Sequence, residues 1–151
     1  MSAPQFSTAQ QVVVDMIDYA KAQPSSPIAD VTVVNERLDR DTAQDADPAL
    51  RDEGAVIVVM LPEAGSGTPN RESNFYFVNV AVVIMANPKV LWNKGGDLLS
   101  MMDSLLAAPT LYTEANRGPA FPKPLEVPVE RIDEGLGYVA YALHYIIPVL
   151  Q

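Results

Sequence analysis

The sequence contains no cysteine and only one histidine among its 151 residues. The absence of cysteine excludes disulfides, thiolate nucleophiles and cysteine metal ligands. A catalytic base needs a positioned partner, so we expect His144 to be an ordinary strand residue satisfied by its neighbours. No apolar run approaches the roughly 18 residues that cross a bilayer. The segment from Met1 to Gln11 has no basic stretch followed by an apolar one, so we expect no signal peptide and no membrane association.

Basic residues are scarce as well. Ten lysines and arginines stand against 19 acidic residues, which gives a formal net charge of -9. Such a surface repels phosphate groups, which disfavours a nucleic-acid reader and a protein that adheres to anionic lipid. Hydrophobic residues make up 48% of the chain, enough to bury a core. The length indicates a single domain spanning residues 1–151.

Motifs that bind nucleotides or metals are missing too. Gly65-Ser66-Gly67 lacks the Gly-Lys-Ser/Thr ending of a phosphate loop, and no dinucleotide fingerprint surrounds Gly95-Gly96. The acidic run from Asp39 to Asp47 lacks the glycine and glutamate that a calcium loop needs at its sixth and twelfth positions. The sequence therefore predicts no catalytic residues, no metal and no cofactor, which disfavours a small α+β enzyme.

Two helices are indicated by apolar residues at a 3.6-residue period. Ser7 is placed to cap the first, with Gln10 three residues later in a capping-box pattern, and Pro24 follows its end. The second helix begins after Asn87-Pro88 and Gly95-Gly96, and is expected to end near Pro109. Its apolar stripe comprises Leu98, Met101, Met102, Leu105 and Leu106.

Strands are indicated by β-branched and alternating apolar residues. The predicted strands cover residues 30–36, 55–61, 74–85, 125–130 and 137–149. The segment from Ala55 to Met85 is expected to form a long antiparallel hairpin. A second hairpin turns through Asp133-Glu134-Gly135, and Pro128 predicts that its first strand lies at a sheet edge. This order predicts an α+β fold, with two helices packed on one side of a mainly antiparallel sheet.

Two segments are expected to be long loops. Residues 36–53 hold seven acids and three arginines with little apolar periodicity, so we expect a mobile, solvated loop. Residues 109–124 are rich in proline and are expected to be irregular. Trp92 and the pairs Phe75/Phe77 and Tyr141/Tyr145 are expected to be core residues, because aromatic side chains carry large buried areas.

The strand from Asn74 to Met85 is apolar on both faces. Two helices can cover only one of them, so the other face, which carries Phe77 and Val83, is expected to contact a further copy of the chain. Arginines of the acidic segment, namely Arg37, Arg40 and Arg51, are expected to anchor it to a neighbour, because a guanidinium group holds carboxylates in a bidentate fork.

The run from Val129 to Tyr145, VERIDEGLGYVAYALHY, resembles the closing hairpin of tail terminator proteins from long-tailed bacteriophages. In that family an Arg-x-Asp stretch, here Arg131 and Asp133, leads through acidic residues and glycine into a tyrosine-rich strand. The order of helices and strands in the rest of the chain is also similar. The likeness between residues is confined to about twenty positions.

The resemblance implies a structural virion protein without enzymatic activity. Such proteins form a ring, usually a hexamer, at the head-proximal end of the tail, after assembly in the host cytoplasm. The ring ends polymerisation of the tail tube protein and joins the tail to the head connector or stopper protein. DNA passes through its lumen without specific binding, which suits an acidic chain. Arg131 and Asp133 are then expected to contact a subunit or partner.

Other readings of the sequence stay open. One is another head-to-tail joining protein or a tail tube-like protein, which would also assemble but polymerise differently. Another is a small acidic binding module that stays monomeric. Contractile and non-contractile tails are not distinguished by any residue pattern in the chain.

Overall fold

The structure, a computed structural model, describes residues 5–64, 75–115, 129–132 and 137–150. A 3-10 turn, Phe6–Thr8, leads into helix α1, Ala9–Lys21, which is followed by β1, Thr32–Asn35, α2, Thr42–Asp52, and β2, Ala55–Val59. The two-residue strand β3, Glu63–Ala64, precedes β4, Phe75–Ala86, and the helices α3, Pro88–Asn93, and α4, Leu98–Ala115. Strands β5, Val129–Ile132, and β6, Val139–Leu150, complete the order.

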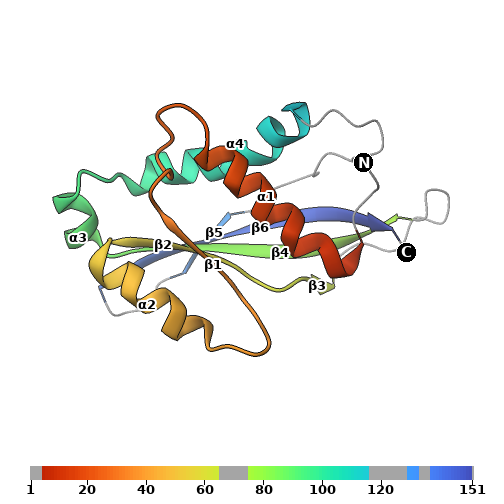
Figure 1. Cartoon of the computed structure of the whole chain (residues 1–151), viewed down its shortest axis with the longest axis horizontal. Helices are drawn as coiled ribbons and strands as arrows, with labels where there is room; N and C mark the ends of the chain where they lie inside the picture. Colours follow the sequence, from red (N-terminus) through yellow and green to blue (C-terminus); the bar gives the residue numbers. More distant parts are fainter. Residues whose placement is uncertain (1–4, 65–74, 116–128, 133–136, 151) are drawn as a thin grey trace.

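One mixed sheet organises the fold, with the strand order β1-β2-β4-β6-β5 and with β3 paired to β4 (Figure 1). Strand β1 runs parallel to β2, and the other neighbours are antiparallel. The longest pairing joins β4 to β6 over twelve residues, from Phe75 opposite Leu150 to Ala86 opposite Val139. The predicted pairing of the 55–61 strand with the 74–85 strand is confirmed, as is the position of β5 at a sheet edge.

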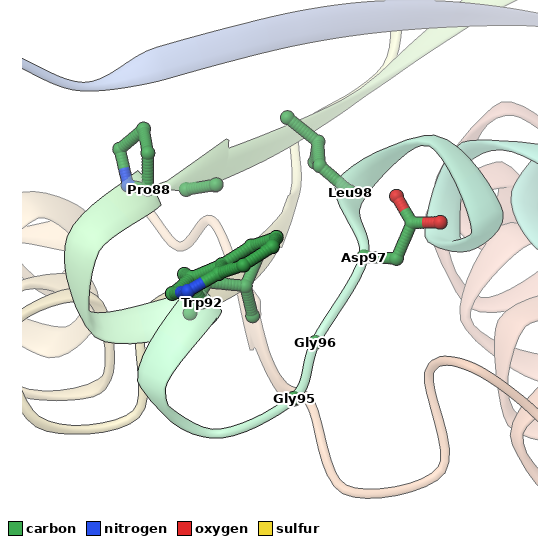
Figure 2. Close-up of a pocket in the computed structure, with 8 residues that line it drawn as sticks. Pro88, Trp92, Gly95, Gly96, Asp97 and Leu98 are labelled. Carbon is green, nitrogen blue, oxygen red and sulfur yellow. The ribbon is translucent and has the colours of Figure 1, made fainter.

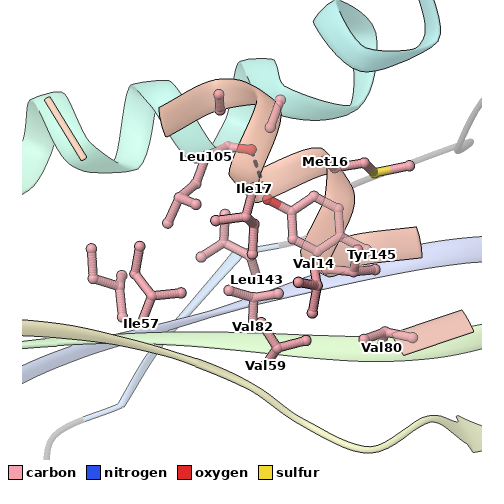
Figure 3. Close-up of a cluster of buried hydrophobic side chains, with 14 of the residues drawn as sticks. Val14, Met16, Ile17, Ile57, Val59, Val80, Val82, Leu105, Leu143 and Tyr145 are labelled. Atoms are coloured by element: carbon pink, nitrogen blue, oxygen red, sulfur yellow. Dashed lines mark hydrogen bonds between the residues drawn. The ribbon is translucent and has the colours of Figure 1, made fainter. Parts of the chain in front are cut away.

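Helices α1 and α4 pack together against one face of this sheet (Figure 1). The predicted α+β fold, with two helices on one side of a mainly antiparallel sheet, is therefore confirmed. The core beneath them is apolar, and its members come from both helices and from β2, β4 and β6 (Figure 3). Its largest fully buried side chains include Met16, Ile17, Ile57, Ile84, Leu105, Leu143 and Tyr145.

Helix α4 continues through Pro109, contrary to the prediction that proline ends it there. Proline has no N–H, so the carbonyl of Leu105, four residues earlier, loses its usual helical donor. The hydroxyl of Tyr145 on β6 donates to that carbonyl oxygen at 2.7 Å (Figure 3). A distant strand thus satisfies the group that proline leaves free. The helical residues Pro109–Ala115 replace the first part of the expected irregular loop, and residues 116–124 lie outside the described residues.

The segment expected to be a mobile loop, residues 36–53, contains helix α2. Parallel strands need a crossover connection, and α2 provides it between β1 and β2. Its buried residues Ala46, Ala49 and Leu50 pack on Val56 and Val58, on the sheet face opposite α1 and α4. The carboxylate of Asp41 caps the helix by accepting hydrogen bonds from the N–H groups of Ala43 and Gln44.

The start of α1 also differs from the prediction. Thr8 rather than Ser7 occupies the position before the helix, and the capping-box pair in the preceding turn is Gln5 with Thr8. Gln10 has a longer-range role, because its amide nitrogen donates to the carbonyl oxygens of Glu36 and Val59 at 3.0 and 3.1 Å. The helix is thereby fastened to the ends of β1 and β2. The expected turns at Gly65-Ser66-Gly67 and at Asp133-Glu134-Gly135 lie outside the described residues.

Candidate functional site

The described helices cover only part of the sheet face opposite α1 and α4. Helix α2 lies over β1 and β2, and among the described residues no helix covers the same face of β4 and β6 (Figure 1). Register places Ala81 opposite His144 and Val83 opposite Ala142 on this face. We call this area the open face, and its half-buried members on β4 and β6 are Phe77, Asn79, Ala81, Val83, His144 and Ile146.

Phe77 and Val83 therefore lie where the sequence placed them, on the second face of the long strand. Both are half-buried, whereas Val78, Val80, Val82 and Ile84, on the core face of β4, are fully buried. The alternation arises because successive side chains of a strand point to opposite faces. A half-buried apolar row beside a fully buried one indicates a surface that further burial would stabilise.

A small polar group interrupts the open face. The amide nitrogen of Asn79 lies 3.1 Å from Nδ1 of His144, and Nε2 of His144 lies 3.6 Å from a carboxylate oxygen of Glu130 on β5. An Nδ1 that accepts from the amide places the ring proton on Nε2, facing Glu130. His144 thus has a neighbour at each ring nitrogen, as predicted for a strand histidine. The side-chain oxygen Oδ1 of Asn79 is buried and has no hydrogen-bond partner among the described residues.

The three arginines predicted as anchors are exposed and already paired within the chain. Arg37 contacts Asp39 at 3.0 Å, Arg40 contacts Asp45 at 2.7 Å, and Arg51 contacts Asp52 at 3.3 Å. They line α2 and the turn before it, away from the open face. Exposed pairs of this kind contribute about 0–1 kcal/mol each.

Arg131 is exposed on the edge strand β5, where its register partner is Tyr141. This pairing places Arg131 on the helix-covered side of the sheet, while Glu130 faces the open side. Asp133 lies outside the described residues. The structure therefore brings Phe77 and Val83 together on one face, and it separates them from the arginines.

Two of the aromatic residues expected in the core, Phe77 and Tyr141, are only half-buried. Trp92 differs more strongly from the prediction. It was expected in the core, yet 82% of its surface is exposed, and Leu91 is the buried residue of α3. An apolar groove of about 500 Å³ runs beside it, between α3 and the start of α4 (Figure 2). Pro88, Trp92 and Leu98 surround this groove, with Gly95 and Gly96 along its edge. We call it the Trp92 groove. Its only sequence signal is the polar surroundings of the tryptophan, which include Asn93 and Lys94.

Gly96 lies close against the buried side chain of Leu91 behind the groove, so a larger residue there would displace that side chain. A Cβ at Gly96 would lie 2.3 Å from a side-chain carbon of Leu91. The carboxylate of Asp97, which follows, accepts from the N–H of Leu99 and from the hydroxyl of Ser100. Asp97 therefore stabilises the first turn of α4 and leaves the groove without a free acid of its own.

Few of the described residues are candidates for metal binding or catalysis. Among them, no three histidine, aspartate or glutamate side chains are grouped so as to hold a metal ion. Two tyrosines have raised pKa values: Tyr145 through burial, and Tyr112 through burial and the nearby charge of Asp15. Both belong to the helix-covered core. Among the described helices, none has the length and apolar content that crossing a bilayer requires.

Neither a protein-family model nor a curated protein sequence matches this chain.

Proposed function

We propose that this chain is a structural protein of a phage tail. Copies of it assemble into a closed ring, a hexamer, at the head-proximal end of the tail. The ring ends polymerisation of the tail tube and joins the tail to the head connector. The proposal draws on the likeness of the Val129–Tyr145 run to tail terminator proteins, and on the order of elements that this likeness implies.

The observation that carries the proposal is the open face. It presents half-buried apolar side chains on β4 and β6 around the polar pair Asn79 and His144, and exposed apolar area on a sheet face gains stability when a partner covers it. Covering it removes apolar area from water, at about 25 cal/mol per Å². The role of the open face is then to be buried in the assembled ring.

The net charge of -9 supports the same role. An acidic lumen wall repels the phosphates of passing DNA, so a ring of such chains lets DNA slide without adhering. The charge also separates free copies before assembly, which means that specific contacts must overcome general repulsion.

The test combines light scattering with electron microscopy of the purified chain, with and without tail tubes. We expect a closed ring of several chains that caps one end of a tube. An open-ended fibre would instead identify a tube-like protein, and a monomer that ignores tubes would identify a binding module.

Variants on the open face make the test specific. Phe77→Asp and Val83→Asp place a charge on that face, where burial in a ring would cost several kcal/mol. We expect folded monomers by circular dichroism and light scattering. Leu106→Asp, on an exposed part of α4, is the matched control and is expected to keep the ring. If Phe77→Asp and Val83→Asp still form rings, the open face is not a subunit contact.

A further inference from the structure

Leu38 and Trp92 are the two most exposed large apolar side chains in the described part of the chain, followed by Leu99. Leu38 is 96% exposed and Trp92 is 82% exposed. An exposed tryptophan beside a groove is typical of an interface anchor, because a large aromatic side chain that fills or borders a pocket dominates binding energy. Neither residue belongs to the open face, so the assembly proposed above does not account for them.

Leu38 projects from a turn that its neighbours hold in shape. Arg37 pairs with Asp39, Arg40 pairs with Asp45, and Asp41 caps α2. The turn is also attached to the sheet, since a carboxylate oxygen of Glu36 accepts from the N–H of Leu61 at 2.9 Å. The leucine is thus presented on a pre-ordered support, which lowers the entropy lost when it binds.

The Trp92 groove has the matching shape and chemistry. Its lining is mainly apolar, from Pro88, Leu91, Trp92 and Leu98, with Asp97 as its charged member, and its volume is about 500 Å³. A cavity of roughly 150 Å³ already holds a benzene ring, so a leucine side chain fits. Figure 2 shows the space between the Trp92 ring and the side chains of Pro88 and Leu98.

The charges around the two features are of opposite sign. Residues 36–45 carry four acids and two arginines, a net charge of -2. Residues 87–97 carry Lys89 and Lys94 against one acid, Asp97 of the groove lining, a net charge of +1 in a chain that is otherwise strongly acidic. Both lysines are exposed, and neither forms an ion pair among the described residues. The two surfaces therefore attract each other where most pairs of surfaces on this protein repel.

The two features lie at opposite ends of the same pair of strands. Strands β1 and β2 are parallel, and the turn with Leu38 follows the end of β1. The groove is at their start, because Gly54, directly before β2, lies against the backbone of Leu91 in α3. A chain with complementary surfaces at its two ends cannot satisfy them within itself. It joins copies head to tail, in a ring if the rotation between copies closes.

We propose that the Leu38 turn of one copy inserts into the Trp92 groove of the next copy, with Lys89 and Lys94 facing the acids of that turn. The inference rests on the proposed ring, and names a contact that holds the ring together. Each groove is completed by a residue of the neighbouring chain, so every copy donates one leucine and accepts one.

Two variants and their mixture test this contact. Leu38→Asp removes the insert, and Trp92→Ala removes a wall of the groove. Both positions are exposed, so both variants are expected to keep the circular dichroism spectrum of the parent chain. We expect each to need at least a tenfold higher concentration to assemble, as for the loss of an interface anchor. Leu106→Ser, another exposed leucine, is the control and is expected to assemble as the parent does.

The mixture gives the sharper result. Trp92→Ala retains an intact turn and Leu38→Asp retains an intact groove, so one copy of each can still join. We expect a 1:1 heterodimer by light scattering, at a concentration where each variant alone is monomeric. A mixture that stays monomeric contradicts the head-to-tail contact.

Because the chain has a single tryptophan, its fluorescence gives an independent test on the unmodified chain. Assembly should shift Trp92 fluorescence to shorter wavelength and reduce its quenching by acrylamide. If Trp92 stays fully quenchable by acrylamide in an assembled ring, the proposal is wrong. It is also wrong if Trp92 becomes protected only when tail tubes are added, because the groove then faces another partner.

The outcomes separate this inference from the ring itself. A parent chain that forms rings, with both variants also forming rings at the same concentration, overturns the contact and leaves the proposed function standing. A parent chain that forms open fibres, with the mixed variants forming heterodimers, supports the contact and contradicts the ring. A parent chain that is monomeric at all concentrations overturns both.

Discussion

At the scale of single residues, the fold depends on a few groups whose partners are far away in the sequence. Tyr145 is the clearest case, because its hydroxyl donates to the Leu105 carbonyl that Pro109 leaves without a donor. Sequence patterns place Tyr145 in the core correctly, from its position in an alternating strand. They cannot show that its hydroxyl lets α4 pass through a proline, since that contact spans forty residues.

Tyr145→Phe is expected to lower the free energy of unfolding by about 1–3 kcal/mol, because a buried carbonyl loses its only strong donor. Urea unfolding at pH 7 measures this loss. Tyr141→Phe is the control, because Tyr141 is half-buried and forms no hydroxyl hydrogen bond among the described residues. An equal effect of the two substitutions would contradict the role given to the hydroxyl.

The same variant has a pH signature. Burial raises the pKa of Tyr145 above the value of about 10 that an unfolded tyrosine has. Above pH 10 the unfolded chain loses this proton while the folded chain keeps it, so stability falls as pH rises. Tyr145→Phe has no hydroxyl to titrate at this position. The difference in free energy of unfolding between the parent chain and this variant is therefore expected to become smaller above pH 10. A difference that stays constant would count against a buried, protonated Tyr145.

Gly54 is a second residue with a specific requirement. It ends α2 with φ of +90°, and a Cβ there would lie 2.6 Å from the backbone nitrogen of Leu91. Gly95 has a similar φ of +74° but open space around it. Gly95→Ala is expected to cost about 1–2 kcal/mol for the left-handed backbone alone. Gly54→Ala is expected to cost more, and equal melting temperatures of the two variants would contradict the close approach of α3.

At the scale of elements, the sequence predicts those whose apolar residues repeat at one period over many positions. Helix α1 and strands β4 and β6 belong to this group, and the residues that the structure buries in them are largely the predicted ones. Helix α2 does not, because it buries only Ala46, Ala49 and Leu50 and holds Pro48 within it. Its stability comes from packing on the sheet beneath it and from the Asp41 cap. Apolar periodicity along the sequence does not reveal either of these contributions.

Helix α2 gives a prediction for the isolated chain. Its backbone hydrogen bonds and its buried face should protect the amides of residues 46, 47 and 49–52 from hydrogen exchange before any assembly. Amides of α1 serve as the reference for the core. Exchange in α2 as fast as in an unstructured peptide would restore the first expectation, a mobile acidic loop.

The residues of the candidate site likewise fall into two groups, those that the sequence could place and those that it could not. Phe77 and Val83 could be placed on a second face from strand alternation alone, because the side-chain period of a strand is two. Trp92 could not, because α3 has six residues and offers too few positions to show which of them point inward. Leu38 was obscured by the charges around it, although those charges are what hold its turn in shape.

At the scale of the whole molecule, the described surface carries two apolar features that have no role in an isolated monomer. One is the open face of β4 and β6, and the other is the pair formed by the Leu38 turn and the Trp92 groove at opposite ends of β1 and β2. In the proposed head-to-tail contact, the Leu38 turn is the donor end of the molecule and the Trp92 groove is its acceptor end. A ring of such units would have two different rims, which suits the proposed position between a tail tube and a head connector.

The position of β6 has a consequence for how the protein is made. This strand comes last in the sequence of strands, yet it lies between β4 and β5 in the sheet. During synthesis, at about 5–20 residues per second, β4 must wait for several seconds with its twelve-residue edge unpaired. Such an edge pairs readily with other nascent chains. The chain is therefore expected to aggregate less during expression when a chaperone shields β4 until β6 leaves the exit tunnel.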